Sequence, residues 1–398
     1  MRQDRLDVSR SIDAALGSGL VRCDGLVDAL ARGNGEQSAA LTVPMAKTAL
    51  LCSAGLGTKG GGVGVVAELI QRALQQRYAV THLEYTPDQS LRSRLKFALG
   101  LAREQMHGHA LQVFSHIDLM RSLRFTPRAN LVGGRAANDV VFVHGIEVWR
   151  TLDSARVAAL KSARVLTNSN FTNTKMQQFH PQLTHARVAH LGVDFGADVD
   201  PAQIAARKAQ IPTVVIVGRM SASERYKGHD QLLEAWPSVV TRFPNAQLFC
   251  IGGGDDVSRL TAKAQQLALA NEVRFIRGLD NAARDQLVQS AHLSAFPSTA
   301  EGFGLAAIEA AGMGVPVLAI DGTVVQEIFG AGNGAIYVSS QSATALSAAI
   351  CAAFQDPEQT LAAGIRAAQF VRANYTSEQF IARFWQALDA PDLRRQSA

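Results

Sequence analysis

Residues 298–317 read STAEGFGLAAIEAAGMGVPV and carry two glutamates, Glu301 and Glu309, with two glycines and a run of small helix-forming residues between them. The apolar segment HLSAFP at 292–297 is expected to be a strand, and a helix is expected to start at Leu305. Backbone N–H groups at a helix N-terminus favour anions, and glycines let a ligand approach the main chain. The stretch therefore predicts an anion-binding turn, with Glu301 in the loop and Glu309 inside the helix. The alternative is a capped helix whose acids only stabilise its dipole.

The composition is that of a globular chain large enough for two domains. The chain has 398 residues, of which 47% are hydrophobic and 18% are charged, and this excludes a disordered or fibrous protein. No apolar run approaches the roughly 20 residues that span a bilayer, and the N-terminal residues lack the apolar segment of a secretory signal. The cysteines show no CxxC spacing, which favours buried thiols in a reducing compartment; they are Cys23, Cys52, Cys250 and Cys351. We therefore expect a cytoplasmic protein without a metal site.

Apolar strands alternate with helical segments in two successive series. The expected strands are 48–53, 79–85, 111–115, 139–144 and 165–168, then 213–217, 246–251, 273–276, 293–297, 316–319 and 335–338. This alternation is typical of parallel sheets with helical crossovers, and it predicts an α/β fold of two facing Rossmann-like parallel-sheet domains. Ligands of such sheets bind beyond the carboxyl ends of the strands. We expect the site in the cleft between the domains.

Four parts of the chain are expected from this pattern, with a polar linker at 192–210. They are a poorly packed leader at 1–44, an N-terminal domain at 45–200, a C-terminal domain at 201–375, and a C-terminal helix at 376–398 that packs back across the domain junction.

A glycine-rich segment follows the first strand. The spacing at 55–60 is a literal GxGxxG, and Glu84 ends the next strand, as in dinucleotide-binding folds. An NAD(P)-dependent oxidoreductase is therefore an alternative. The glycines continue through Gly61 and Gly62, so the helix is expected to start later than that fingerprint requires. The general inference is a main chain open to a phosphate or a sugar.

Two basic residues follow the first strand of the second strand–helix series. The strand at 213–217 is followed by Gly218 and Arg219, and Lys227 precedes the next helix. Arginine makes bidentate contacts with phosphate, and lysine acts as a point charge, so the pair can neutralise a diphosphate. The alternative is a pair of solvated loop cations that interact with Glu224.

Arg219, Lys227 and EGFGLAAIE at Glu301–Glu309, followed by AGMGVPV, together resemble the retaining glycosyltransferases of family 4 (glycosyltransferase group 1), which have the GT-B fold. The resemblance covers about residues 47–390. It implies a hexosyltransferase that moves a sugar from a GDP- or UDP-linked donor, bound by the C-terminal domain, to a glycan or lipid-linked acceptor, bound by the N-terminal domain, in polysaccharide or lipopolysaccharide synthesis. It also implies retention of configuration with no metal or other cofactor. A non-catalytic sugar-nucleotide-binding subunit is a further alternative.

The resemblance implies a role for individual residues. Arg219 and Lys227 would hold the donor diphosphate, Glu309 would hydrogen-bond the ribose, and Glu301 would face the transferred sugar. His144, after the strand VVFV, falls where the family often has a His or Asp near the sugar, although a core histidine is an equal alternative. The expected catalytic residues are Glu301, Arg219, Lys227 and His144, and the expected donor-binding residues are Gly61, Gly62, Gly218, Phe303, Gly304, Leu305 and Glu309. A DxD at Asp198–Asp200 lies in the linker and is expected to be a solvated acidic stretch.

The segment 88–135 is strongly basic. Its net charge of +5 equals that of the whole chain, and Leu91, Leu95, Leu99, Ala102 and Met106 fall on one helix face within it. Such a segment can lie on an anionic membrane surface, so peripheral binding to the inner face of the membrane is expected. The alternative is a helix packed on its own sheet with solvated bases. Nucleic acid is not an expected partner, because no aromatic residues interleave with the bases.

Overall fold

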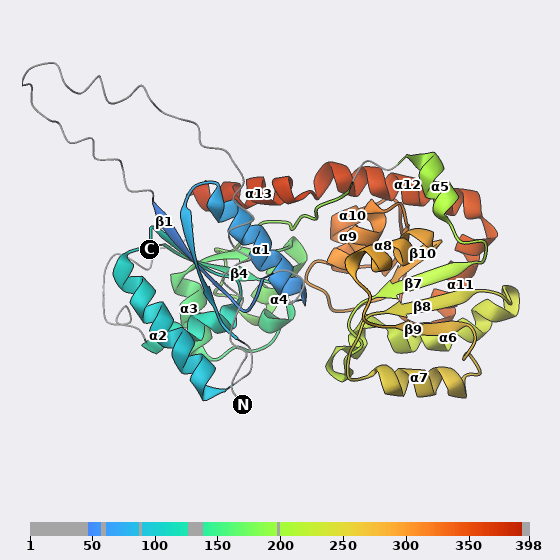
Figure 1. Ribbon diagram of the computed structural model, residues 1–398, viewed down its shortest axis with the longest axis horizontal. Helices are drawn as coiled ribbons and strands as arrows, with labels where there is room; N and C mark the ends of the chain where they lie inside the picture. The colour runs from blue at the N-terminus through green and yellow to red at the C-terminus, as the bar shows by residue number, and fades with distance from the viewer. Residues whose placement is uncertain (1–46, 57–60, 87–89, 126–137, 197–199, 392–398) are drawn as a thin grey trace, which may run out of the picture. The chain divides into compact units, whose positions relative to one another are not determined.

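The computed structural model describes residues 47–56, 61–86, 90–125, 138–196 and 200–391 (Figure 1). Within these residues the chain forms two six-stranded sheets in which neighbouring strands are parallel. The α/β fold with two Rossmann-like parallel sheets is therefore confirmed. The leader expected at 1–44 lies outside the described residues. No described helix is both long enough and apolar enough to cross a bilayer.

The first sheet has the strand order β2-β1-β3-β4-β5-β6. Its strands are β1 (Thr48–Ser53), β2 (Ala79–Glu84), β3 (Leu111–Phe114), β4 (Asp139–Val143), β5 (Arg164–Thr167) and β6 (Arg187–Val188). All residues of β3 and β4 are buried, which explains why these strands are continuous apolar runs rather than alternating ones. β2 and β3 pair with opposite edges of β1, so the sheet grows in two directions from β1.

The second sheet has the strand order β12-β11-β10-β7-β8-β9. Its strands are β7 (Thr213–Val217), β8 (Gln247–Ile251), β9 (Val273–Ile276), β10 (Leu293–Phe296), β11 (Val317–Ile320) and β12 (Ala335–Val338). From β7 the chain adds β8 and β9 on one side, and it then returns to add β10, β11 and β12 on the other.

Helices connect the strands of both sheets. The first series has α1 (Gly61–Gln75), α2 (Leu91–His107), α3 (Ser154–Ser162) and α4 (Asn170–Phe179), with the 3-10 helices η2 (Ile117–Phe125) and η5 (Ile146–Val148). The second has α5 (Pro201–Arg207), η6 (Ala222–Lys227), α6 (His229–Arg242), α7 (Val257–Gln266), α8 (Asn281–Ser290), α9 (Leu305–Gly312), α10 (Val324–Phe329), α11 (Ala343–Gln355), α12 (Pro357–Asn374) and α13 (Ser377–Asp389).

Two segments differ from their expected structure. Gly61 and Gly62 were expected in a loop but form the first turn of α1, where backbone amides have no acceptor within the helix. The expected linker at 192–210 contains α5, because Asp200 accepts the amide of Ala202 (3.0 Å) and proline suits the first helical position. Asp200 of the DxD is thus a helix cap, and Asp198 lies outside the described residues.

The C-terminal helix α13 packs on α1 (Figure 1), and it also contacts β6 of the first sheet. It begins with a capping box in which Thr376 and Gln379 bond to one another's backbone amides. Its buried Phe380 meets Phe142 of β4 with ring centroids 6.2 Å apart. The apolar core around α13 extends from the first sheet and α1 to α9 and α10, so the helix joins elements from both halves of the chain.

Candidate functional site

The carboxyl ends of β7 and β10 form a topological switch point, because the chain leaves β7 in one direction and returns to β10 in the other. Ligands of open α/β sheets bind at such points. A crevice of about 10 Å³ lies there, and we call it the β7/β10 crevice; it is lined by Ile216, Val217, Lys227, His229, Ala295, Phe296, Ser298 and Glu301. Two predicted site residues that are far apart in the sequence, Lys227 and Glu301, therefore share one crevice.

The two predicted diphosphate cations are both paired with carboxylates. Lys227 Nζ lies 3.3 Å from Glu301 Oε1 and 3.8 Å from Glu224 Oε2. Arg219 donates a hydrogen bond to Glu224 Oε1 at 2.5 Å. The Arg219 side chain is 74% exposed, whereas that of Lys227 is 20% exposed. The pairing with Glu224 that the sequence left as an alternative is thus present, and Lys227 also reaches Glu301.

Local backbone geometry positions Lys227 at the crevice. η6 ends at Lys227, and Gly228 then turns the chain into α6 with a left-handed φ of 87°. A Cβ on Gly228 would lie 2.6 Å from Pro297 Cγ, which leaves no room for a larger residue. Gly218, at the end of β7, would bring a Cβ to 3.6 Å from Lys227 Cδ. Gly228 therefore lets the end of η6 approach the segment after β10, whereas the 3.6 Å at Gly218 is an ordinary van der Waals distance that does not require glycine.

The EGFG turn leads from β10 into α9. Gly304 precedes Leu305, the first residue of α9, with a left-handed φ of 91°. The Phe303 ring is buried, with its centroid 6.1 Å from that of His190 and 6.0 Å from that of Tyr375. Its side chain belongs to the core, so any contact of Phe303 with a ligand must come from its backbone. The predicted helix start at Leu305 is confirmed.

The pKa values of Glu301 in the turn and of Glu309 in α9 are both raised. Burial raises the pKa of Glu301, and the nearby Lys227 ammonium opposes that rise. Burial also raises the pKa of Glu309, and Arg284 of α8, whose Nη1 lies 3.8 Å away, opposes it. Sequence reasoning missed Arg284, because no local pattern indicates that α8 brings it to α9.

The EGFG turn passes directly beside the carboxyl end of β4. A Cβ on Gly302 would overlap the carbonyl oxygen of His144, and a Cβ on Gly145, which has a φ of 147°, would lie 3.0 Å from Gly302 Cα. The Gly302 carbonyl accepts hydrogen bonds from Ser169 Oγ (2.7 Å) and Thr172 Oγ1 (3.2 Å). Glycine is required at both 145 and 302 for this close approach. The structure thus brings the predicted His144 and Glu301 segments together.

The His144 ring has structural partners. Its Nε2 donates to the Ser115 carbonyl at 2.6 Å, and it stacks on His116 with ring centroids 5.9 Å apart. Its backbone amide donates to the Glu147 carboxylate at 2.5 Å. Burial lowers the pKa of His144, which favours the neutral ring at neutral pH. His144 therefore combines a satisfied core histidine with a position beside the EGFG turn.

A second contact between the halves of the chain was not foreseen from the sequence. Glu327 of α10 accepts the backbone amides of Asn170 (2.7 Å) and Phe171 (2.6 Å) at the start of α4, and His190 Nε2 donates to it at 2.7 Å. Burial alone would raise the pKa of Glu327, but these hydrogen bonds hold it below its ordinary value. Sequence reasoning gave His190 no role, because its partner is distant in the chain.

The glycine-rich segment is described only in part. No atom of the described residues would lie within 4 Å of a Cβ on Gly61 or Gly62, the first two residues of α1. Two glycines of the dinucleotide fingerprint, Gly57 and Gly60, lie outside the described residues. Among the residues that the structure describes, no group of three or more His, Cys, Asp and Glu side chains is placed to hold a metal ion.

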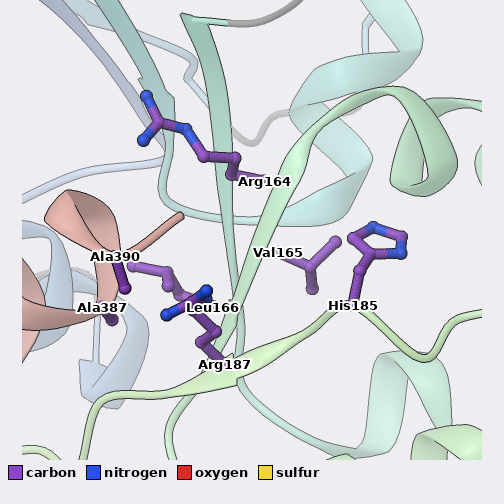
Figure 2. A pocket seen from close by; sticks show the side chains of 7 residues that line it. All are labelled: Arg164, Val165, Leu166, His185, Arg187, Ala387 and Ala390. Atoms are coloured by element: carbon purple, nitrogen blue, oxygen red, sulfur yellow. The ribbon is translucent and has the colours of Figure 1, made fainter. Parts of the chain in front are cut away.

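Another cavity of about 10 Å³ lies between β5, β6 and the end of α13 (Figure 2). The lining of this cavity includes Arg164, the first residue of β5. The cavity therefore does not lie beyond the carboxyl end of the strand, where ligands of such sheets bind. Arg164 Nη1 donates to the Leu388 carbonyl at 2.8 Å, and Arg187 donates to the Pro391 carbonyl. Cations that bond to the last carbonyls of a helix stabilise its C-terminus. We therefore assign this cavity to the docking of α13 and not to a ligand.

Comparison with known families and proteins gives consistent matches. Residues 202–370 match the family model described as glycosyl transferases group 1. The phosphatidyl-myo-inositol mannosyltransferase of Mycobacterium tuberculosis is 38% identical over 131 residues, which are 32% of this chain and 33% of that protein. The GDP-mannose-dependent alpha-(1-6)-phosphatidylinositol monomannoside mannosyltransferase of Mycolicibacterium smegmatis is 28% identical over 292 residues, 68% of this chain and 74% of that protein. The chain spans about a third to a half of the length of the phosphatidyl-myo-inositol mannosyltransferases that it matches.

Solved structures match across both sheets. Sucrose-phosphate synthase from Thermosynechococcus elongatus has a TM-score of 0.70 at 20% identity, covering 86% of this chain and 98% of that one. Anabaena Alr3699/HepE in complex with UDP has a TM-score of 0.66 at 19% identity, covering 86% and 99%. At this level of identity the likeness shows the fold, which is GT-B.

Proposed function

We propose that this chain, a member of the glycosyl transferases group 1 family through residues 202–370, transfers a sugar from a nucleotide-sugar donor to a lipid-linked or glycan acceptor. The observation that carries the proposal is the approach of Lys227 to Glu301 at 3.3 Å in the β7/β10 crevice. This crevice is at the switch point of the sheet that the family match covers. We propose that the donor diphosphate binds beside it.

Positive charge at this point suits the chemistry. Breaking a sugar–phosphate bond places negative charge on the diphosphate and oxocarbenium character on the sugar, as in glycoside hydrolysis. Lys227 and Arg219 would stabilise the diphosphate, and the amides at the N-terminus of α9 would face its distal oxygens. The carboxylates of Glu301 and Glu224 already neutralise both cations, so donor binding requires at least Arg219 to exchange its partner.

The remaining predicted residues have separate roles in this proposal. Glu309, which lies in α9 with Arg284 Nη1 3.8 Å away, would accept hydrogen bonds from the ribose hydroxyls. His144 would position the EGFG turn and face the sugar as a neutral hydrogen-bonding group. We further propose that transfer retains the configuration of the sugar without a metal ion, and that the departing phosphate deprotonates the acceptor, as the resemblance to family 4 implies.

A lipid-linked acceptor at a membrane surface is the acceptor that we favour. The two mannosyltransferases above act, by their names, on phosphatidylinositol lipids, and one depends on GDP-mannose. α2 packs through Phe97, Ala98 and Leu101, Ala102 is half-buried, and its larger remaining apolar side chains are exposed. Leu91, Leu95, Leu99 and Met106 are 82%, 61%, 63% and 76% exposed. The alternative without a membrane, a helix packed on its own sheet with solvated bases, accounts for the buried Phe97, Ala98 and Leu101, but it gives the exposed leucines no role.

This surface supports peripheral binding to the cytoplasmic face of the membrane. The exposed bases on α2 are Arg92, Arg94, Lys96 and Arg103. An apolar helix face gains free energy by entering the lipid headgroup region, and each nearby cation adds about 1 kcal/mol with anionic lipids. A lipid-linked acceptor could then reach the first sheet while its lipid stays in the membrane.

A donor screen tests the proposal. The full chain is incubated with GDP-mannose and a panel of other GDP- and UDP-sugars, with NAD(H) as the competing ligand, and its melting temperature is measured. We expect one nucleotide sugar to raise the melting temperature and NAD(H) to leave it unchanged. Mass spectrometry of the stabilising donor with phosphatidylinositol then detects transfer or hydrolysis. Stabilisation by NAD(H) alone would contradict the proposal, and binding without transfer or hydrolysis would favour a non-catalytic subunit.

A further inference from the structure

Two buried polar side chains in the wall of the β7/β10 crevice each have one polar atom without a hydrogen-bond partner among the described residues. His229 is 4% exposed and Ser298 is 3% exposed. Among the described residues, neither His229 Nε2 nor Ser298 Oγ has a hydrogen-bond partner. Both residues line the crevice. A buried polar atom without a hydrogen bond destabilises the fold, so such atoms in native proteins are normally satisfied by protein or ordered water.

The two side chains come from opposite sides of the switch point. His229 is the first residue of α6 and follows the Lys227–Gly228 turn, whereas Ser298 follows β10 and precedes the EGFG turn. Lys227 and Glu301 complete the polar lining of the same space. Its volume of about 10 Å³ is close to that needed for a single water molecule, which requires two to four polar partners.

We propose that His229 and Ser298 hold one water molecule in the β7/β10 crevice and that this water positions the Lys227 ammonium for the donor diphosphate. The second part of this statement rests on the proposed function, whereas the first does not. In this proposal neither His229 nor Ser298 contacts the sugar or the phosphate. They act through Lys227 and are positioning residues.

The chemistry of the four groups fits one water. Burial, with Lys227 as a second cause, lowers the pKa of His229 to about 4, so its ring is neutral at neutral pH and has one donor and one acceptor nitrogen. The Ser298 hydroxyl both donates and accepts, and the Lys227 ammonium only donates. A water that accepts from Lys227 and bonds to His229 and Ser298 would satisfy all three. It would give the ammonium a neutral partner in addition to its two carboxylates.

The first test is structural and uses the full chain without a donor. A crystal structure at a resolution that shows ordered water should have density within hydrogen-bond distance of His229 Nε2 and Ser298 Oγ. Ser298→Ala should lower the melting temperature, because it removes a hydrogen bond to the water. Without a water, the same change would remove an unsatisfied hydroxyl and raise the melting temperature. A dry crevice, or a higher melting temperature for Ser298→Ala, overturns the proposal.

The second test measures turnover of the donor. Ser298→Ala and His229→Leu should lower kcat between about tenfold and a hundredfold, because small misplacements of a catalytic group have effects of that size. His229→Gln, which offers polar atoms near the position of Nε2, should recover part of the loss. Ser294→Ala is the matched control, since Ser294 is a buried serine of β10 that does not line the crevice. Equal kcat values for Ser298→Ala and the native protein would overturn the positioning role.

The two tests separate this inference from the proposed function. If no nucleotide sugar binds or reacts, the proposed function fails, and the crystal structure and the sign of the Ser298→Ala melting shift still decide whether the water is present. If a donor reacts normally in Ser298→Ala and His229→Leu, the proposed function stands and the positioning role is wrong.

Discussion

Glu224 Oε1 accepts a hydrogen bond from the Arg219 guanidinium at 2.5 Å, and Glu224 Oε2 lies 3.8 Å from Lys227 Nζ. One carboxylate therefore interacts with both cations that are expected to meet the donor diphosphate. The Arg219 side chain is 74% exposed, and ion pairs so open to water contribute about 0–1 kcal/mol. This pair is thus weak enough for a diphosphate to displace. In this view Glu224 holds Arg219 near the crevice until the donor arrives.

The first prediction follows from that exchange. Glu224→Gln removes a negative charge that competes with the diphosphate, so GDP or UDP should bind more tightly by about 1 kcal/mol, roughly fivefold, at low salt. Isothermal titration calorimetry with the nucleoside diphosphate measures this. Glu234→Gln is the control, because Glu234 of α6 pairs with Lys263 of α7 and does not line the crevice. Weaker binding in Glu224→Gln would mean that Glu224 orients Arg219 for the ligand.

Lys227 itself provides the second prediction. Lys227→Met keeps the length of the side chain and removes its charge, so kcat with the preferred donor should fall about 10²–10³-fold, as for other losses of a preorganised group that stabilises developing charge. Steady-state kinetics with the donor and acceptor measure the change. Lys263→Met, a matched lysine paired with Asp230 and Glu234, should keep kcat near that of the native protein. An unchanged kcat in Lys227→Met would exclude Lys227 from the reaction.

A ribose contact from Glu309 is the third prediction. Glu309→Gln should weaken GDP or UDP binding by about 2 kcal/mol, because hydrogen bonds to a charged group contribute roughly that amount. The same variant should bind a nucleoside diphosphate without ribose hydroxyls as well as the native protein does. Titration of both ligands into both proteins completes the comparison. An equal loss for the two ligands would show that Glu309 acts elsewhere, for example through Arg284.

The raised pKa of Glu309 gives the fourth prediction. Burial is its first cause, and a carboxyl whose pKa is higher in the folded than in the unfolded state contributes stability at low pH that is lost as the pH rises through the folded pKa. Glu309→Gln cannot ionise, so it should melt at a higher temperature than the native protein at pH 7.5. The difference should shrink as the pH falls toward 4. Glu378→Gln, at a carboxylate that is 76% exposed, is the control and should show no such trend.

The fold could be predicted from the sequence because the patterns that specify strands and helices are local. Buried parallel strands such as β4 are continuous apolar runs, and the helices between them follow from their period and their caps. The start of α9 at Leu305 could be predicted for the same reason, since glycines before a run of small residues mark a helix N-terminus. The α5 helix was missed because its seven residues begin with Pro201 directly after Asp200, and both residue types also suit a linker.

The interactions within the site could be predicted only in part. Arg219 and Lys227 follow one strand and Glu301 another, and parallel strands place their carboxyl ends together, so their proximity follows from topology. Which carboxylate neutralises which cation depends on side-chain packing that no spacing encodes. The pairing of His190 with Glu327 is a contact between distant segments, and it required the tertiary structure.

Membrane binding by α2 is the fifth prediction. We expect the full chain to sediment with vesicles that contain phosphatidylglycerol and to remain in solution with vesicles of phosphatidylcholine alone. Replacing Leu91, Leu95 and Leu99 by serine should abolish sedimentation, because each exposed leucine that enters the lipid contributes about 1.5–3 kcal/mol. Phe179→Ser is the control, since Phe179 is an apolar side chain on α4 that is 48% exposed.

The basic residues of α2 should contribute to membrane binding in a way that depends on the salt concentration. Reversing the charges of Arg92, Arg94 and Lys96 should weaken binding at low salt, and the difference from the native protein should shrink as salt screens the lipid charge. The leucine variant should instead stay unbound at every salt concentration, because its loss is apolar. Transfer to a water-soluble acceptor analogue should be unchanged in both variants, which separates membrane binding from catalysis. Sedimentation that is insensitive to both sets of changes would show that α2 does not contact the membrane.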